Sequence, residues 1–323
     1  MKRHIICERD AGLFSLIQQV IANIPWAINE ARIPIVYFQG KTCYWTPNGY
    51  HDKDTVWEYY FEPVLTKYPA SSIPRHIRDS ISCNHPSPFE VGYFADEETF
   101  VSNHFGDHPA LEGKTLSIPY LWDDPDHTLR QEANKIIRRF VRPRDYIRKK
   151  VDQFFEQHMK GHRTIGVHMR GTDAISKEEI RAHRQGSLVL SKYVAELRRL
   201  LEVQASRIFV ATDDQSSLEY LRSVFGDRVF AYDSIRHRAG DPAGKGPTGW
   251  IMPAYIVGDR DLAAKNGEEA VIEYLLLSQC DRVIHNGSGL ARTVLLNVPQ
   301  LPHTNTHSRK QQHSVNALRL NAL

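Results

Sequence analysis

The second half of the chain alternates short apolar runs with amphipathic stretches, and this pattern constrains the fold more than any other feature. Short apolar runs bounded by polar turns are typical of buried strands, and apolar residues with helical spacing are typical of helices. We expect strands at 164–168, 207–211, 229–232 and 282–285 and helices at 191–201, 215–224, 268–279 and 289–296. Alternating strands and helices form a parallel sheet with both faces covered, so this half predicts a doubly wound α/β domain.

The first half opens with a similar pattern. A strand at 4–7, a helix at 13–22 and a strand at 33–38 again predict a parallel sheet with helices packed on it. Because 323 residues exceed what one hydrophobic core usually holds, we expect two domains. Charged helices at 129–140 and 145–158 mark the boundary between them. The predicted division is a first domain at 1–145, a second at 146–302, and a tail at 303–323 that is a terminal helix or partly disordered.

Charge and composition exclude several classes of protein. The 41 Lys and Arg against 38 Asp and Glu leave a net charge of +3, which is too balanced for a protein that binds nucleic-acid backbones. The start of the chain fits no signal peptide, and the apolar runs are far shorter than the roughly 20 residues that span a bilayer. We therefore expect a cytoplasmic protein without a transmembrane segment. The widely spaced cysteines at 7, 43, 83 and 280 are expected to be free thiols.

Polar residues follow three of the predicted strands in the second half. They lie at 168–173, 212–215 and 286–289. Ligands of open α/β sheets bind at the carboxyl ends of the strands, so these three segments are the first candidates for a site. All three are expected to share one edge of the sheet.

Within these segments, Arg170 and Ser288 are the best candidates for holding phosphate. The planar guanidinium of Arg170 suits bidentate binding of a diphosphate, although a structural salt bridge with Asp173 is an equal alternative. Ser288 lies between Gly287 and Gly289 at the start of a helix, where free N–H groups and the helix dipole attract anions. An ordinary helix cap is the commoner use of such a serine.

Other polar pairs and triplets are weaker signals. Asp213 and Asp214 are candidates for contacts to a ribose or base, and we expect at least one of them to cap the helix that follows. Three triplets match the DxD pattern of metal-dependent glycosyltransferases, at 52–54, 124–126 and 259–261, but none follows an apolar strand. Histidine and cysteine spacing shows no zinc motif. We therefore expect neither a metal nor another cofactor.

Three stretches in order resemble the α-1,6-fucosyltransferases, a group that includes bacterial nodulation fucosyltransferases and the animal core-fucosylation enzyme. Residues 165–173, Ile-Gly-Val-His-Met-Arg-Gly-Thr-Asp, resemble that family's IGVHxRRTD motif. Residues 210–214 resemble its second strand with an acidic pair, and residues 277–281, followed by Ser288 and Arg292, resemble its LSQAD and serine motif. The resemblance covers residues 160 to 300, about half of the chain.

The resemblance implies a GT-B-like fold, in which two Rossmann-like domains face each other across a cleft, and a metal-independent enzyme that inverts the anomeric centre. It implies that the C-terminal domain holds GDP-fucose and that Arg170 grips the β-phosphate. Glu178 lies where the family's proposed base is found, with Glu179 beside it, although both also fit a charged helix surface. The donor-binding set implied by the motifs is His168, Arg170, Asp173, Asp213, Asp214, Glu273, Gly287, Ser288, Gly289 and Arg292.

The chain departs from the family pattern at two positions. Gly171 replaces the second arginine of the motif, and Ala174 replaces a nearby lysine. Either Lys177 or Arg292 compensates for the lost charge, or the donor differs. We therefore predict a glycosyltransferase that moves fucose from GDP-fucose to an oligosaccharide or glycoconjugate. The alternatives are a GT-B enzyme with another nucleotide sugar, and a non-catalytic nucleotide- or carbohydrate-binding protein with a decayed donor site.

Overall fold

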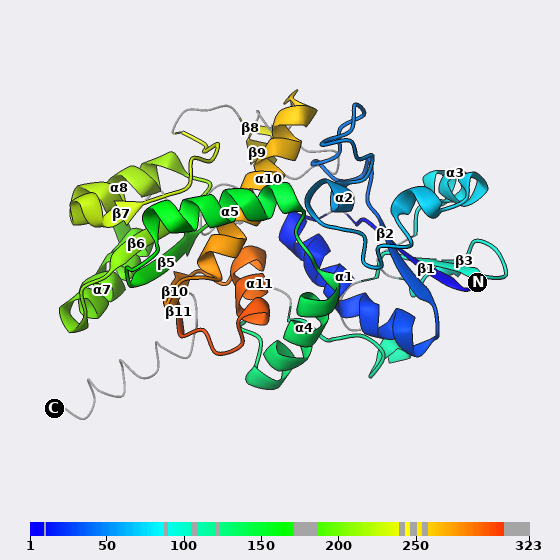
Figure 1. The fold of residues 1–323 in the computed structure, drawn as a ribbon, viewed down its shortest axis with the longest axis horizontal. Coiled ribbons are helices and arrows are strands. Elements are labelled where there is room, and N and C mark those ends of the chain that lie inside the picture. The colour runs from blue at the N-terminus through cyan, green and yellow to red at the C-terminus, as the bar shows by residue number, and fades with distance from the viewer. Residues whose placement is uncertain are drawn as a thin grey trace.

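A computed structural model describes residues 1–9, 11–86, 90–104, 109–119, 123–170, 187–238, 243–245, 251–253 and 258–306. Two β-sheets built mainly of parallel strands lie toward opposite ends of the molecule, with helices between them (Figure 1). We refer to them as the N-terminal sheet, with strand order β2-β1-β4-β3, and the C-terminal sheet, with order β11-β10-β5-β6-β7.

The N-terminal sheet pairs β1 (Arg3–Cys7) in parallel with β2 (Ile33–Tyr37) on one side and β4 (Thr99–Ser102) on the other. A short strand, β3 (Tyr93–Phe94), adds an antiparallel edge. Side chains of β1 alternate between the two faces, because Ile6 joins the core beneath α1 (Leu13–Asn29) whereas Ile5 and Cys7 pack toward α3 (Arg75–Cys83). The helix α2 (Val56–Tyr60) and the 3₁₀ turns η1 (Ala70–Ser72) and η2 (Pro109–Leu111) complete this half.

The C-terminal sheet is parallel throughout and covered on both faces, as predicted. Its strands are β5 (Thr164–Met169), β6 (Arg207–Thr212), β7 (Val229–Phe230), β10 (Arg282–His285) and β11 (His303–Asn305). Ile208 and Val210 face α7 (Ser187–Val203) and α8 (Gln215–Phe225), whereas Phe209 faces the core shared with α10 (Arg260–Leu277) and α11 (Gly289–Asn297). The 3₁₀ turn η3 (Gly226–Arg228) leads into β7, and β8 (Ala243–Lys245) forms a separate antiparallel pair with β9 (Ile251–Pro253).

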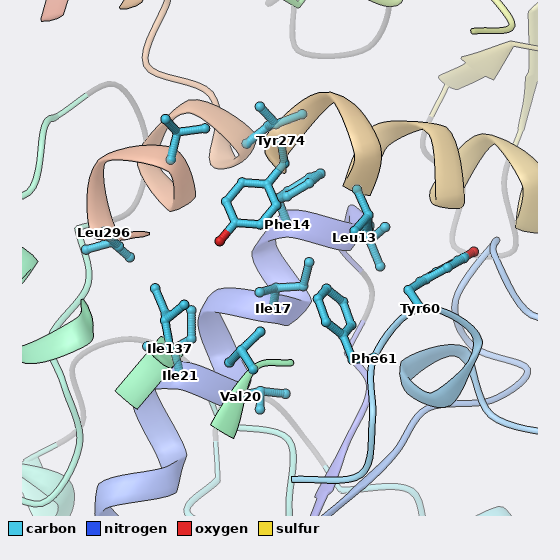
Figure 2. Close-up of a cluster of buried hydrophobic side chains, with 14 of the residues drawn as sticks. Leu13, Phe14, Ile17, Val20, Ile21, Tyr60, Phe61, Ile137, Tyr274 and Leu296 are labelled. Carbon is cyan, nitrogen blue, oxygen red and sulfur yellow. The ribbon is translucent and has the colours of Figure 1, made fainter. Parts of the chain in front are cut away.

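Helices from both halves of the chain build one continuous hydrophobic core. The helix α1 packs against α11, which also contacts α4 (His127–Phe140), and α5 (Asp145–His158) packs against α10. In Figure 2, the side chains of α1 lie between those of α4 and those of the two C-terminal helices, with Ile17, Ile137 and Tyr274 among them. The two halves are therefore joined by buried apolar surface, which resists separation.

The structure corrects several expectations about single elements. Residues 303–305, which were expected to belong to a helical or disordered tail, form β11 and pair with β10. The first helix extends through Pro25 to Asn29, and the helix expected from residue 268 begins at Arg260. All four cysteines are free thiols, as predicted.

Candidate functional site

The three strand-end segments lie at one edge of the C-terminal sheet. His168 of β5 pairs in register with Ala211 of β6 and with His285 of β10. Because the strands are parallel, the residues that follow them leave the sheet at the same edge. The prediction that these segments come together is confirmed for residues 168–170, 212–215 and 286–289, whereas 171–173 lie outside the described residues.

Arg170 lies where the two halves of the chain meet. Its carbonyl accepts a 3.1 Å hydrogen bond from the side-chain amide of Asn286. Nη2 of its guanidinium is 3.7 Å from the position that a Cβ on Gly12 would take, and Gly12 is the N-cap residue of α1. A guanidinium beside the positive end of a helix dipole is an arrangement that attracts anions.

The loop after β10 is held in place by buried side chains. Gly287 has a φ of 71°, a left-handed conformation that favours glycine. Its N–H donates to Nδ1 of His285 at 3.0 Å, and its carbonyl accepts from Nη1 of Arg292 at 2.9 Å. Arg292 is buried, with 4% of its surface exposed, so its charge lies inside the site. Arg292 therefore lies next to the loop, and its compensation for the arginine missing at position 171 stays a prediction.

Ser288 is the N-cap residue of α11, and Gly289 is the first residue of the helix. Contacts of Gly289 hold this N-terminus against α1. Oγ of Ser288 accepts from the N–H of Ala291 at 3.2 Å, so the helix-cap alternative is confirmed for this serine. A Cβ on Gly289 would lie 3.4 Å from Cβ of Phe14, and the Gly289 carbonyl accepts from Nε2 of Gln18 at 2.7 Å. These contacts hold the N-termini of α1 and α11 together next to Arg170.

His168 lies below this edge as a neutral, buried side chain. Burial lowers its pKa to about 3, with further contributions from nearby His285 and Arg170. Its Nδ1 is 3.1 Å from the carbonyl of Ala211, which only accepts hydrogen bonds, so the ring hydrogen is on Nδ1. His168 therefore supports the strand ends and carries no positive charge at neutral pH.

The acidic pair after β6 divides into two roles. Asp214 caps α8, because its carboxylate accepts from the N–H of Ser217 at 2.9 Å. The carbonyl of Asp213 accepts from the N–H of His237 at 2.8 Å, and the Asp213 carboxylate lies close enough to Glu273 to raise the pKa of that residue. The expected capping role thus falls to Asp214.

Glu273 is buried on α10 beside this pair. Its Oε1 accepts from Oγ of Ser234 at 2.8 Å and lies 3.4 Å from Nη2 of Arg236. Burial raises the pKa of Glu273 to about 7, with the charges of Glu269 and Asp213 acting in the same direction and Arg236 and Ser234 opposing them. At neutral pH this carboxyl is therefore shared between its protonated and ionised forms, and it can donate or accept a hydrogen bond.

Sequence reasoning missed Ser234 and Arg236, the hydrogen-bonding partners of Glu273. Other predicted residues lie outside the described part of the chain. These are Gly171, Asp173, Ala174, Lys177, Glu178 and Glu179. Their roles stay predictions.

The DxD triplets have structural roles in the described residues. Asp126 caps α4 and Asp259 caps α10. Asp261 accepts a hydrogen bond from Oγ1 of Thr46, which links α10 to the first half. Asp52 has a φ of 59° in a turn. Asp124 contacts His285 and His303 in a partly buried polar cluster.

The sequence matches a known family over the second half of the chain. Residues 126–301 match the family Nodulation protein Z (NodZ). A nodulation protein Z of Bradyrhizobium diazoefficiens is 31% identical over 158 residues, which cover 48% of this chain and 39% of that protein. A nodulation protein Z of Sinorhizobium fredii is 25% identical over 182 residues, covering 53% and 51%. The chain therefore spans about half or less of the length of these curated relatives.

Solved structures resemble almost the whole chain. A crystal structure of the fucosyltransferase NodZ from Bradyrhizobium has a TM-score of 0.57 at 19% identity and covers 93% of this chain and 94% of that chain. POFUT1 in complex with GDP has a TM-score of 0.51 at 10% identity and covers 94% and 97%. The predicted GT-B-like α/β fold is confirmed. Among the described residues, we find no helix that is long and apolar enough to cross a membrane.

Proposed function

Since the chain belongs to the NodZ family, we propose that it is a glycosyltransferase that transfers fucose from GDP-fucose to a saccharide acceptor. The observation that carries the proposal is the position of Arg170, whose guanidinium lies beside the N-cap of α1. The N-terminus of α11 is fastened to α1 at the same place. A diphosphate bound there meets a guanidinium and two helix ends.

This arrangement suits the chemistry of glycosyl transfer. The bond between the anomeric carbon and the diphosphate oxygen breaks, and the electron pair stays on the leaving phosphate. Groups that stabilise this growing negative charge lower the barrier most when they are already oriented. Arg170 and the dipole of α11 stabilise the negative charge on the leaving diphosphate, so no divalent cation is required.

The acceptor side of the reaction completes the proposal. The acceptor hydroxyl attacks the anomeric carbon from the face opposite the diphosphate, with inversion, and a carboxylate takes its proton. We retain Glu178 as that base. Asp213 and Glu273, which lie together near the end of β6, are proposed to contact the ribose or the guanine. The cytoplasmic location and the oligosaccharide or glycoconjugate acceptor stay predictions.

Calorimetric titration of the full chain tests the donor assignment. We expect GDP and GDP-fucose to bind in EDTA, UDP to bind more weakly, and Arg170→Ala to weaken GDP binding by roughly thirtyfold or more, because a charge partner of the phosphate is lost. Arg138→Ala, on the exposed face of α4, is the matched control. A preference for UDP, a requirement for a divalent cation, or unchanged GDP binding by Arg170→Ala would each contradict the proposal. GDP binding without transfer to any saccharide would favour a non-catalytic nucleotide-binding protein.

A further inference from the structure

A partly buried polar cluster connects the donor loop to the first half of the chain. His285 ends β10 immediately before the loop, and its side chain is fully buried. Asp124, from the segment that precedes α4, places Oδ1 at 3.7 Å from Nε2 of His285 and Oδ2 at 3.3 Å from Nε2 of His303. Both Asp124 and His303 lie just outside the residues 126–301 that match the family.

The hydrogen bonds of His285 fix which of its nitrogens carries the hydrogen. Nδ1 accepts the N–H of Gly287 at 3.0 Å, so this nitrogen has a free lone pair and no hydrogen. Burial lowers the pKa of His285 to about 4, although Asp124 raises it, so the ring is neutral near pH 7. The single ring hydrogen is therefore on Nε2. Among the described residues this buried N–H has no hydrogen-bond partner, and the Asp124 carboxylate lies beside it, with Oδ1 at 3.7 Å.

The Asp124 carboxylate is held by its own partners. Nδ2 of Asn305 donates to Oδ1 at 3.0 Å, and the ring of His303 lies against Oδ2. Burial opposes ionisation of Asp124, but contacts with His303, His285 and Asn305 outweigh it and lower its pKa. A negative charge is thus kept beside the buried Nε2–H of His285, which favours that tautomer.

A cation between Asp124, His285 and His303 is the competing interpretation, since their ligand atoms lie within 4.8 Å of one another. Two contacts oppose it. A metal needs a lone pair on Nε2 of His285, yet this nitrogen carries the hydrogen. In addition, Nη2 of Arg130 lies 3.1 Å from Nε2 of His303, so a positive charge already occupies that side. The contacts therefore describe a polar cluster in which the Asp124 carboxylate faces the N–H of His285, with no place for a metal ion.

We propose that Asp124 is a positioning residue of the donor site: it holds His285 in the tautomer whose Nδ1 accepts the Gly287 N–H, and so fixes the loop that opens α11. The inference rests on the proposed function, because that function assigns the loop to the diphosphate. Asp124 acts through His285 and does not itself contact the donor.

Two substitutions of His285 separate this role from simple packing. Asparagine places an amide oxygen near the position of Nδ1, so His285→Asn keeps an acceptor for Gly287, whereas His285→Gln places its amide near Nε2 and loses that acceptor. We expect His285→Asn to bind GDP within about threefold of the wild type and His285→Gln to bind about tenfold more weakly, at similar melting temperatures. Equal losses, or tighter binding by His285→Gln, would overturn the proposal.

Asp124 itself is tested with a conservative variant and a truncation. Asp124→Asn keeps a partly negative oxygen beside the Nε2–H of His285 and should bind GDP within about threefold of the wild type, whereas Asp124→Ala removes it and should lose about tenfold. Equal GDP affinities for Asp124→Ala and the wild type would refute the role. Stoichiometric binding of Zn²⁺ that is lost in Asp124→Ala would establish the cation interpretation instead.

Nitrogen NMR of the histidine-labelled, unliganded full chain decides the tautomer without any variant or donor. A hydrogen on Nε2 of His285 is the expected result, and a hydrogen on Nδ1 would overturn the proposal. If the wild-type chain binds no GDP, the proposed function fails, whereas the tautomer still decides whether Asp124 faces the N–H of His285 in this cluster. The two failures are therefore distinguishable.

Discussion

The helices α8 and α11 begin at the same edge of the C-terminal sheet, and each begins with a capping side chain. Asp214 caps α8 and Ser288 caps α11. Their surroundings differ, because α8 is buried on one face only whereas α11 is buried from Gly289 to Leu296. The N-terminus of α11 is held against α1 next to Arg170, whereas at the start of α8 the backbone of His237 forms hydrogen bonds with Asp213 and Gln215.

The different surroundings of the two caps show why a capped helix N-terminus alone does not indicate a ligand site. A cap satisfies backbone N–H groups at any helix end and carries no information about ligands. At α11, a second helix end and a guanidinium from a neighbouring strand are added, and they come from opposite halves of the chain. The positive potentials of these groups add, so a diphosphate is favoured at α11 and not at α8.

The largest effect that tests this comparison is expected from Arg170→Ala. Removal of the guanidinium should lower the turnover of GDP-fucose by about 10²–10³-fold, as for other groups that stabilise developing charge. Arg222→Ala, at the exposed far end of α8, is the control and should change turnover less than twofold. The measurement is the rate of GDP release in the presence of a saccharide acceptor, with melting temperatures recorded beside it. Turnover of Arg170→Ala within threefold of the wild type would remove the basis of the comparison.

The pattern of the sequence was sufficient to predict the C-terminal sheet and its functional edge. Buried parallel strands carry nearly continuous apolar runs, so β5, β6 and β10 are visible without a structure. The strand β11 was missed because its three residues, His303, Thr304 and Asn305, are polar. They pair with β10 at the edge of the sheet, where strands need less apolar surface.

Contacts between distant residues limited the prediction of helices and site residues. The start of α10 was placed too late. A glycine inside a helix weakens the sequence signal, and here Gly267 makes room for Tyr60, whose hydroxyl would lie 2.3 Å from an added Cβ. The partners of Glu273 and of His285 lie far away in sequence, on segments without regular periodicity. Only the fold brings Arg236 and Asp124 to them.

The substitution Glu273→Gln tests the surroundings of the start of α8, because its effect on the free energy of unfolding depends on pH. The pKa of Glu273 is raised to about 7 from an ordinary value of 4.5, so the folded chain holds a proton that the unfolded chain has released. Its contribution to stability is therefore present below pH 4.5 and is lost as the pH rises to 7. Relative to Glu273→Gln, the wild type should lose up to about 3 kcal/mol of unfolding free energy across this window.

Urea unfolding at a series of pH values measures this difference. The control is Glu156→Gln, since Glu156 is exposed on α5 and pairs with Lys160 at the surface. Parallel stability curves for the wild type and Glu273→Gln would show that the carboxyl is ionised as in water, and the environment assigned to it would be wrong.

A smaller effect is expected at the junction of α1 and α11. Gln18 and Gln19 are neighbouring buried residues, but Gln18 donates to Gly289 at 2.7 Å whereas Gln19 donates to the carbonyl of Cys7 at 2.8 Å. Each change to leucine should lower the unfolding free energy by about 1–2 kcal/mol, because one or two buried hydrogen bonds are lost. Only Gln18→Leu should also weaken GDP binding, by severalfold in calorimetry. A larger loss of GDP affinity in Gln19→Leu would place the critical contact at β1 instead of at α11.

The smallest effects come from the two caps themselves, and they test the comparison most directly. Ser288→Ala and Asp214→Ala each remove one cap, so each should cost about 1 kcal/mol of unfolding free energy. Oγ of Ser288 accepts from Ala291, which leaves its O–H to donate to a phosphate, so Ser288→Ala should also weaken GDP binding about threefold to tenfold. Asp214→Ala should leave GDP binding unchanged. If both variants lose the same GDP affinity, the start of α8 contributes to binding the diphosphate as well, and burial against α1 is not what distinguishes the two helices.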